Sequence, residues 1–180
     1  MKSTKLDNDK YYTPIDLAEE CIDKTFKIIG KENITEIIEP SAGNGSFSNQ
    51  IANCIAYDLV PESDNIKTAD FLDMKLGYKS GRLFIGNPPF GVHNKLVVDF
   101  YDKCCECGDY IAFILPISCY KNDIKLYKFD LIYSEDLGLR YYTDRELHCC
   151  FNIYRRPDSG AFNQKPNYEL NEITLRSFYE

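Results

Sequence analysis

The chain has 180 residues, of which 44% are apolar, enough to build the hydrophobic core of one domain. No window approaches the roughly 20 apolar residues of a membrane span, and the polar start MKSTKLDNDK lacks the apolar stretch of a secretory signal, so we expect an intracellular, cytoplasmic protein without membrane contact. The net charge of −7 argues against tight, autonomous binding to nucleic acid, because phosphate neutralisation supplies much of such affinity.

The eight cysteines favour reduced thiols in a reducing compartment, since several lie in apolar runs where a thiol packs as a small hydrophobe. Cys104 and Cys107 form a C-x-x-C pair, and His148 with Cys149 could complete a zinc site. The second half lacks ligand spacing of its own, so the expected site contains no metal. The sequence leaves the zinc alternative open.

Short apolar runs alternate with amphipathic segments along the chain. A helix is expected over 15–29, where apolar residues recur at helical spacing behind Thr13 as cap and Pro14 as first helical residue. Two more helices are expected, one after the glycine-containing turn in 41–52 and one over 94–107 that ends at Gly108. The expected strand segments are 35–40, 54–61, 66–73, 82–90, 110–116, 128–134 and 148–156.

This alternation of strands and helices predicts an α/β domain with a mainly parallel sheet. Ligands of such sheets bind outside the carboxyl ends of the strands. The segments EPSAGNG, YD, ADF and NPPF each follow a strand candidate. They are therefore expected to converge on one edge of the sheet.

The first of these segments has the composition of a ligand-binding turn. Gly43 and Gly45 permit positive φ and close approach of a ligand to the backbone, although an ordinary strand-turn-helix would also use them. The dinucleotide pattern G-x-G-x-x-G is incomplete, and Glu39 would repel a pyrophosphate. A carboxylate there suits a ligand with an ammonium group, such as S-adenosylmethionine.

Two acidic residues follow the next two strand candidates. Asp58 is placed to accept hydrogen bonds from ribose hydroxyls, and Asp70 from an adenine amino group while Phe71 packs on the base. Each aspartate could equally serve to form a turn.

The ordered set EPSAGNGSF, AYD, ADFL and GNPPF resembles the S-adenosylmethionine-dependent adenine-N6 nucleic-acid methyltransferases with an Asn-Pro-Pro-Phe motif. YYTP before the set, and IAFILPIS and HCCFNIYRR after it, extend the resemblance over about residues 11–156. It implies a Rossmann-like class I methyltransferase fold: a mainly parallel seven-stranded sheet with the last strand antiparallel and helices on both faces. We expect one catalytic domain over 1–180, with 157–180 as an irregular extension and no separate target-recognition domain.

The resemblance also implies roles for individual residues. Asn87 and the Pro88 carbonyl would accept the two hydrogens of the target amino group, with Pro89 stiffening the turn and Phe90 stacking on the base. Phe151 is expected as a second aromatic wall, with Tyr154 as a weaker candidate. The residues expected to hold S-adenosylmethionine are Tyr12, Thr13, Pro14, Glu39, Pro40, Ser41, Ala42, Gly43, Gly45, Phe47, Asp58, Asp70, Phe71 and Asn87.

The reaction implied is direct in-line methyl transfer to adenine N6, with DNA favoured over RNA as the nucleic-acid partner. A specificity or activating protein subunit remains open as a second partner. Two alternatives stay open as well: methylation of a protein glutamine side chain, whose enzymes carry Tyr in place of Phe90, and a non-catalytic cofactor-binding subunit. His93 and His148 are expected to be surface or structural residues rather than bases.

Overall fold

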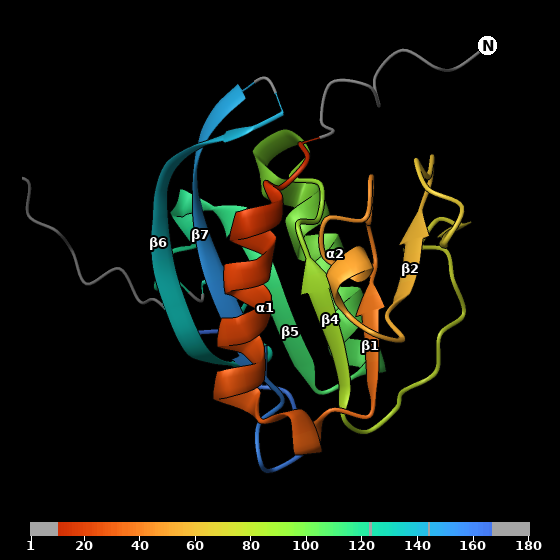
Figure 1. Ribbon diagram of the computed structural model, residues 1–180. Helices are drawn as coiled ribbons and strands as arrows, with labels where there is room; N and C mark the ends of the chain where they lie inside the picture. Colours follow the sequence, from red (N-terminus) through yellow and green to blue (C-terminus); the bar gives the residue numbers. More distant parts are fainter. Residues whose placement is uncertain (1–10, 123, 144, 167–180) are drawn as a thin grey trace, which may run out of the picture.

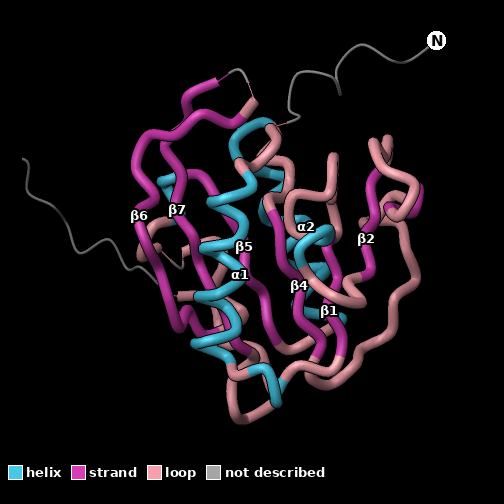
Figure 2. Tube along the Cα trace, viewed as in Figure 1, coloured by secondary structure: helices cyan, strands magenta, loops and turns pink. Residues whose placement is uncertain are grey.

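The computed structural model describes residues 11–122, 124–143 and 145–166. Within them, one seven-stranded sheet has the strand order β3-β2-β1-β4-β5-β7-β6 (Figures 1 and 2). Six of these strands run in one direction, and β7 runs antiparallel between β5 and β6. This confirms the expected mainly parallel sheet. The strands are β1 (Glu36–Glu39), β2 (Ile55–Asp58), β3 (Ile66–Thr68), β4 (Arg82–Gly86), β5 (Tyr110–Pro116), β6 (Asp130–Tyr142) and β7 (Arg145–Arg155).

Two α-helices of the described residues cover opposite faces of the sheet, α1 (Ile15–Ile29) in front and α2 (Lys95–Cys107) behind in Figure 1. Leu17 and Cys21 of α1 belong to one core cluster with Leu83 of β4. Phe100 of α2 belongs to a second cluster with Phe84, the next residue of the same strand. Alternate residues of β4 thus serve two cores, which is why this central strand is apolar throughout.

Short 3-10 turns take the place of helices elsewhere: η1 (Lys31–Asn33), η2 (Ser48–Gln50), η3 (Val92–Asn94) and η4 (Ile117–Cys119). Neither α-helix in the described part of the chain has the length and hydrophobicity of a transmembrane span.

Two details of the predicted helices were wrong. The glycine turn leads only into η2, because the segment carries few apolar residues after Phe47 and turns again at Asn53, whose φ is 62°. The cap of α1 is Pro14 rather than Thr13, and the helix begins at Ile15. The Thr13 side chain does not cap the helix; its Oγ1 instead accepts a hydrogen bond from Asn87.

The hairpin of β6 and β7 is longer than the sequence predicted. Pairing continues to Tyr142 opposite Arg145, through register shifts between Leu131 and Tyr133 and between Asp136 and Gly138. These bulges break the alternation of polar and apolar residues, which hid the strand in the sequence. β5 ends at Pro116, so the last part of the hairpin projects beyond the carboxyl edge, at the top left of Figure 1.

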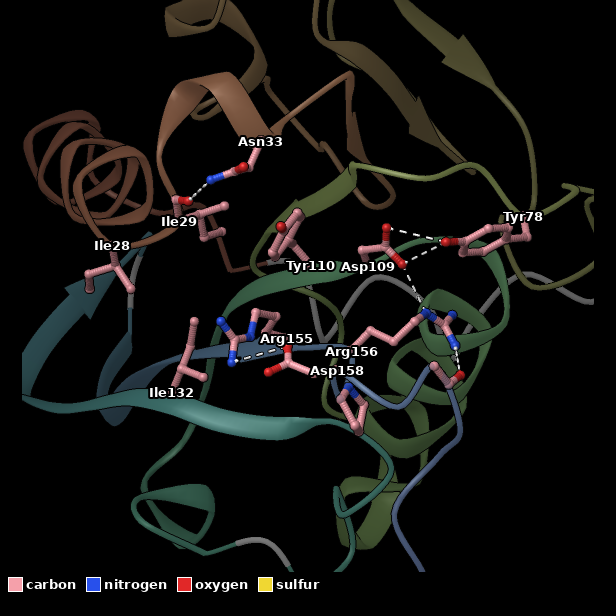
Figure 3. A pocket seen from close by; sticks show the side chains of 12 residues that line it. Ile28, Ile29, Asn33, Tyr78, Asp109, Tyr110, Ile132, Arg155, Arg156 and Asp158 are labelled. Atoms are coloured by element: carbon pink, nitrogen blue, oxygen red, sulfur yellow. Dashed lines mark hydrogen bonds and ion pairs between the residues drawn. The ribbon is translucent and has the colours of Figure 1, made fainter.

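At the opposite, amino edge, Arg156 ties the end of β7 to the loop before β5. Its Nε donates to Asp109 Oδ1 at 2.9 Å (Figure 3). Its Nη2 donates to the carbonyls of Cys105 and Gly108 at 2.5 and 2.8 Å. The guanidinium also lies 4.9 Å from the centre of the Phe129 ring. The guanidinium group of Arg156 is thus engaged by hydrogen bonds and by contacts with aromatic rings.

We expect Arg156→Ala to lower the free energy of unfolding by about 3 kcal/mol, because it leaves the largely buried Asp109 without its cation. Arg155→Ala is the matched control, since the neighbouring side chain is exposed and reaches only Asp158 at 3.6 Å; its effect should stay below about 0.5 kcal/mol. Urea denaturation of both variants measures the difference. Equal midpoints would contradict the structural role of Arg156.

Candidate active site

The chain segments singled out in the sequence meet at the carboxyl edge of the sheet, above β1, β2 and β4 in Figure 1. The glycine turn follows β1, Asp58 ends β2, and Asn87 directly follows β4. The segment before α1 reaches the same place, because Asn87 Nδ2 donates to the Tyr11 carbonyl and to Thr13 Oγ1, both at 3.3 Å. One edge therefore gathers four distant parts of the sequence.

The glycine turn is packed between Asp58 and Tyr12. Gly43 has φ of 54°, and its N–H donates to Asp58 Oδ2 at 2.8 Å. A Cβ atom at Gly43 would lie 3.0 Å from the Tyr12 ring, so only glycine lets the ring lie this close. Burial, reinforced by the hydrogen bond that Tyr12 donates to Glu62, raises the pKa of Tyr12 to about 12. Tyr12 is therefore a neutral cover over the turn.

Glu39, the last residue of β1, is an acidic side chain held inside the protein. It is 2% exposed, and its Oε2 accepts the N–H of Ser48 at 2.8 Å. Burial raises its pKa to about 7, because removal from water penalises the charged form more than this hydrogen bond favours it. Its Cγ would lie 3.3 Å from a Cβ atom at Gly86, whose φ is 147°, so β4 has room for Glu39 because its last residue is glycine.

Asn87 carries one of three buried side-chain atoms without a hydrogen-bond partner among the described residues, the others being in Ser48 and Tyr142. Its nitrogen is held by Tyr11 and Thr13, whereas its Oδ1 is buried and accepts no hydrogen bond from any described residue. An unpartnered buried acceptor costs roughly 1–3 kcal/mol, so such atoms are rare and point to a donor that arrives with a ligand. Pro88, which follows, is buried, and the half-buried Phe90 lies with its ring 6.4 Å from that of Tyr11.

Three aromatic rings predicted to contact ligands lie in the core instead. Phe71 is 2% exposed and stacks on Phe100 at 5.5 Å, with Phe84 edge-on at 5.6 Å. Phe151 and Tyr154 of β7 are fully buried in the two different core clusters. This corrects their assignment: both faces of β7 are covered, so neither ring is presented to a base.

The remaining predicted residues lie where the chain order places them. Asp58 is half-buried and accepts the N–H of Val60 through Oδ1 at 2.8 Å, in addition to Gly43. Asp70 is exposed two residues beyond β3 and accepts the N–H of Leu72 at 3.0 Å, which is the turn-forming role left open above. Pro40, Ala42, Gly45 and Phe47 are buried in the glycine turn, with Ser41 half-buried.

No protein-family model matches this chain, and no curated protein matches it. Several solved structures are similar. A protein from Pyrococcus horikoshii described as a candidate RNA methyltransferase has a TM-score of 0.67 and 14% identity, covering 86% of this chain and 90% of that one. A candidate class I S-adenosylmethionine-dependent methyltransferase from Listeria monocytogenes gives 0.63 and 13%, covering 92% and 66%. The 23S rRNA methyltransferase ErmE gives 0.56 and 11%, covering 82% and 70%.

The fold is the Rossmann-like class I methyltransferase fold. At these identities the likeness establishes the fold alone, and the site must be judged on its own residues. In this fold, as in other α/β sheets, the carboxyl edge is where ligands bind. The predicted residues and the unpartnered Asn87 oxygen lie on that edge.

The residues of the zinc alternative are scattered across this fold. His148 pairs with Asp136 at 2.7 Å on the hairpin, while Cys104 and Cys149 are buried in different core clusters. Among the residues that the structure describes, no group of three or more His, Cys, Asp or Glu is placed to hold a metal ion. His93 is exposed in η3.

Sequence reasoning missed three residues beside the site: Tyr11, Thr143 and Arg145. Tyr12 N–H donates to Thr143 Oγ1 at 2.9 Å, and Arg145 Nη1 donates to Tyr11 Oη at 3.1 Å. Tyr11 could have been found from its place in YYTP. The two hairpin residues give no signal, because their contacts span 131 and 134 positions.

We expect Glu39→Gln to change how stability depends on pH. The folded-state pKa of about 7 lies above the ordinary 4.5, so the folded protein holds the extra proton between these values. The stabilisation from protonated Glu39 is complete below about pH 4.5 and is lost as pH rises through 7. The free energy of unfolding therefore falls by about 3 kcal/mol over this range in the wild type, and this pH dependence should be absent in Glu39→Gln. Urea denaturation from pH 5 to 8 measures it, with the exposed Glu106→Gln as control. Parallel curves for wild type and Glu39→Gln would contradict the raised pKa.

Proposed function

We propose that this protein transfers a methyl group from S-adenosylmethionine to the exocyclic N6 of adenine in nucleic acid. The observation that carries the proposal is the buried Oδ1 of Asn87, for which the described residues supply no donor. It follows the central strand β4 and precedes Pro88 and Phe90, at the ligand-binding edge of a class I methyltransferase fold.

The residues around the glycine turn fit S-adenosylmethionine. Asp58 accepts one backbone N–H on each oxygen, and the second lone pair of each oxygen remains for ribose hydroxyls. Glu39 suits the ammonium group of the cofactor, since a cation nearby would restore the ionised carboxylate that burial disfavours. Because Gly43 has no side chain, a ligand could approach the backbone of the turn closely at this position. The similar structures described as methyltransferases support the same cofactor.

Asn87 and Pro88 would make the amino nitrogen of adenine a better nucleophile. The adenine amino nitrogen is a weak nucleophile, because its lone pair is delocalised into the ring. Acceptors at Asn87 Oδ1 and the Pro88 carbonyl would hold its two hydrogens, favour tetrahedral geometry and stabilise the positive charge that develops. The bound cofactor supplies a sulfonium methyl group for direct transfer. A neutral amide suffices as acceptor, because the proton leaves only after the new C–N bond has formed.

The hydrogen bonds of Asn87 also decide which end of its amide faces the target. The Tyr11 carbonyl can only accept, so the nitrogen turns toward it, where the Thr13 hydroxyl also accepts, and the oxygen turns away. With Phe151 in the core, stacking on the target base is assigned to Phe90 and the neighbouring Tyr11 ring. A base in a duplex would have to leave its stack, at a cost of a few kcal/mol.

The nucleic acid can be DNA or RNA. The motifs EPSAGNGSF and YTP favour DNA, whereas two of the similar structures are described as RNA methyltransferases. The deciding experiment incubates the protein with methyl-labelled S-adenosylmethionine and unmethylated DNA, RNA or a glutamine peptide, followed by digestion and identification of the product. N6-methyladenine supports the proposal. Label on glutamine, or cofactor binding without any transfer, would overturn it.

Asn87→Ala should lower the turnover number about 100-fold or more, by removing one of the two acceptors for the amino group. The dissociation constant for S-adenosylmethionine should change by less than about threefold, and the free energy of unfolding by less than about 1 kcal/mol, because the lost oxygen was unpartnered. Single-turnover kinetics, calorimetric titration and urea denaturation measure the three effects. Asn33→Ala, at the amino edge, is the control. Retained turnover, or loss of cofactor binding instead, would refute the assigned role.

A further inference from the structure

The segment Tyr11–Thr13 links the active-site amide to the tip of the β6–β7 hairpin. We propose that Arg145 is a positioning residue that acts through Tyr11 on Asn87, so that the hairpin tip controls how the target amino group is held. This inference rests on the proposed function and adds to it a residue that touches neither cofactor nor target base.

On its outer side, the segment is gripped by the hairpin. Arg145 Nη1 donates to Tyr11 Oη at 3.1 Å, and the guanidinium carbon lies 5.8 Å from the centre of the same ring. Thr143 Oγ1 accepts the Tyr12 N–H at 2.9 Å. The grip thus combines a charged hydrogen bond, a cation–ring contact and a backbone hydrogen bond.

On its inner side, the segment orients Asn87. The two bonds from Asn87 Nδ2, to the Tyr11 carbonyl and to Thr13 Oγ1, are both 3.3 Å long. Hydrogen bonds of this length lie at the weak end of the normal range, so a small outward shift of Tyr11 would break the bond to its carbonyl and leave the amide held by Thr13 alone. Asn87 could then rotate, and its Oδ1 would no longer be directed by the protein.

The hairpin is suited to this role because its tip extends beyond the end of β5 and reaches the N-terminal segment. β5 pairs with β7 only as far as Cys149, so the residues from Arg145 to His148 pair with β6 alone. The position of the tip therefore depends on its pairing within the hairpin and on its contacts with neighbouring segments. Among the described residues, the side chains of Thr143 and Arg145 bond to Tyr12 and Tyr11, while Leu147 packs against the core cluster that contains α1.

Arg145 is exposed, and an exposed arginine near a nucleic-acid site could instead bind a phosphate. The structure favours positioning, because the guanidinium is already engaged with the hydroxyl and the ring of Tyr11. Glu146, which follows it on the tip, is also exposed and adds a negative charge there. The two roles differ in the kinetic constant that they affect.

The test compares Arg145→Ala, Tyr11→Phe and the double variant in the full chain, with Arg155→Ala on the same strand as control. Arg145→Ala should lower kcat about fivefold, while KM for the nucleic acid and the dissociation constant for S-adenosylmethionine change less than about twofold. Tyr11→Phe removes the hydroxyl but keeps the ring, and the double variant should be no slower than Arg145→Ala, since both changes break one bond. The side-chain NH₂ resonances of Asn87 should shift in Arg145→Ala and stay in place in Arg155→Ala.

A raised KM for nucleic acid with unchanged kcat would overturn the proposal in favour of a phosphate contact, as would losses that add in the double variant. If the wild type methylates adenine and Arg145→Ala is equally fast, the positioning role fails while the proposed function stands. If the wild type transfers no methyl group, the proposed function fails. Hydrogen exchange of the Tyr12 backbone amide, which needs no substrate, then still tests whether Arg145 holds the N-terminal segment against the hairpin. Equal exchange rates in wild type and Arg145→Ala would overturn that role of Arg145.

Discussion

The side-chain amide of Asn87 is held at its nitrogen and left without a partner at its oxygen, and the organisation of the carboxyl edge depends on this asymmetry. A carbonyl and a hydroxyl oxygen from the N-terminal segment fix the nitrogen, so the oxygen is directed without being satisfied. The amide could not be oriented in this way by the sheet alone, since β4 ends one residue earlier. The segment before α1 is therefore part of the site.

The glycine turn beside Asn87 depends on close packing against the backbone. Gly43 and Gly86 let Tyr12 and Glu39 approach main-chain atoms that any side chain would cover. In the fully described segment between β1 and β2, the chain forms turns and one short 3-10 helix, η2. Here two carboxylates, those of Glu39 and Asp58, accept backbone N–H groups of the turn.

The sequence was informative where chemistry and backbone conformation coincide, and misleading where only residue type was available. Prolines after Asn87 restrict φ and glycines after Glu39 permit positive φ whatever surrounds them, so the edge on which they meet could be predicted. Phe71 and Phe151 have the chemistry to stack on a base, but burial is a property of the packed sheet, and both belong to its cores. The grip of Arg145 on Tyr11 joins residues 134 positions apart and no local pattern encodes it.

The two edges of the sheet show why an unpartnered atom is a better guide to the site than a hollow is. The amino edge contains a cavity of about 410 Å³ lined by Tyr78, Asp109 and Arg156, among others (Figure 3). There Arg156 donates from all three guanidinium nitrogens, and Asp109 accepts bonds in return. The carboxyl edge keeps a buried acid and an unpartnered acceptor, both of which cost folding free energy. Ser48 Oγ and Tyr142 Oη are also buried and unpartnered among the described residues, but of the three atoms only that of Asn87 directly follows the central strand β4, which supports our proposal that the chemistry takes place beside it.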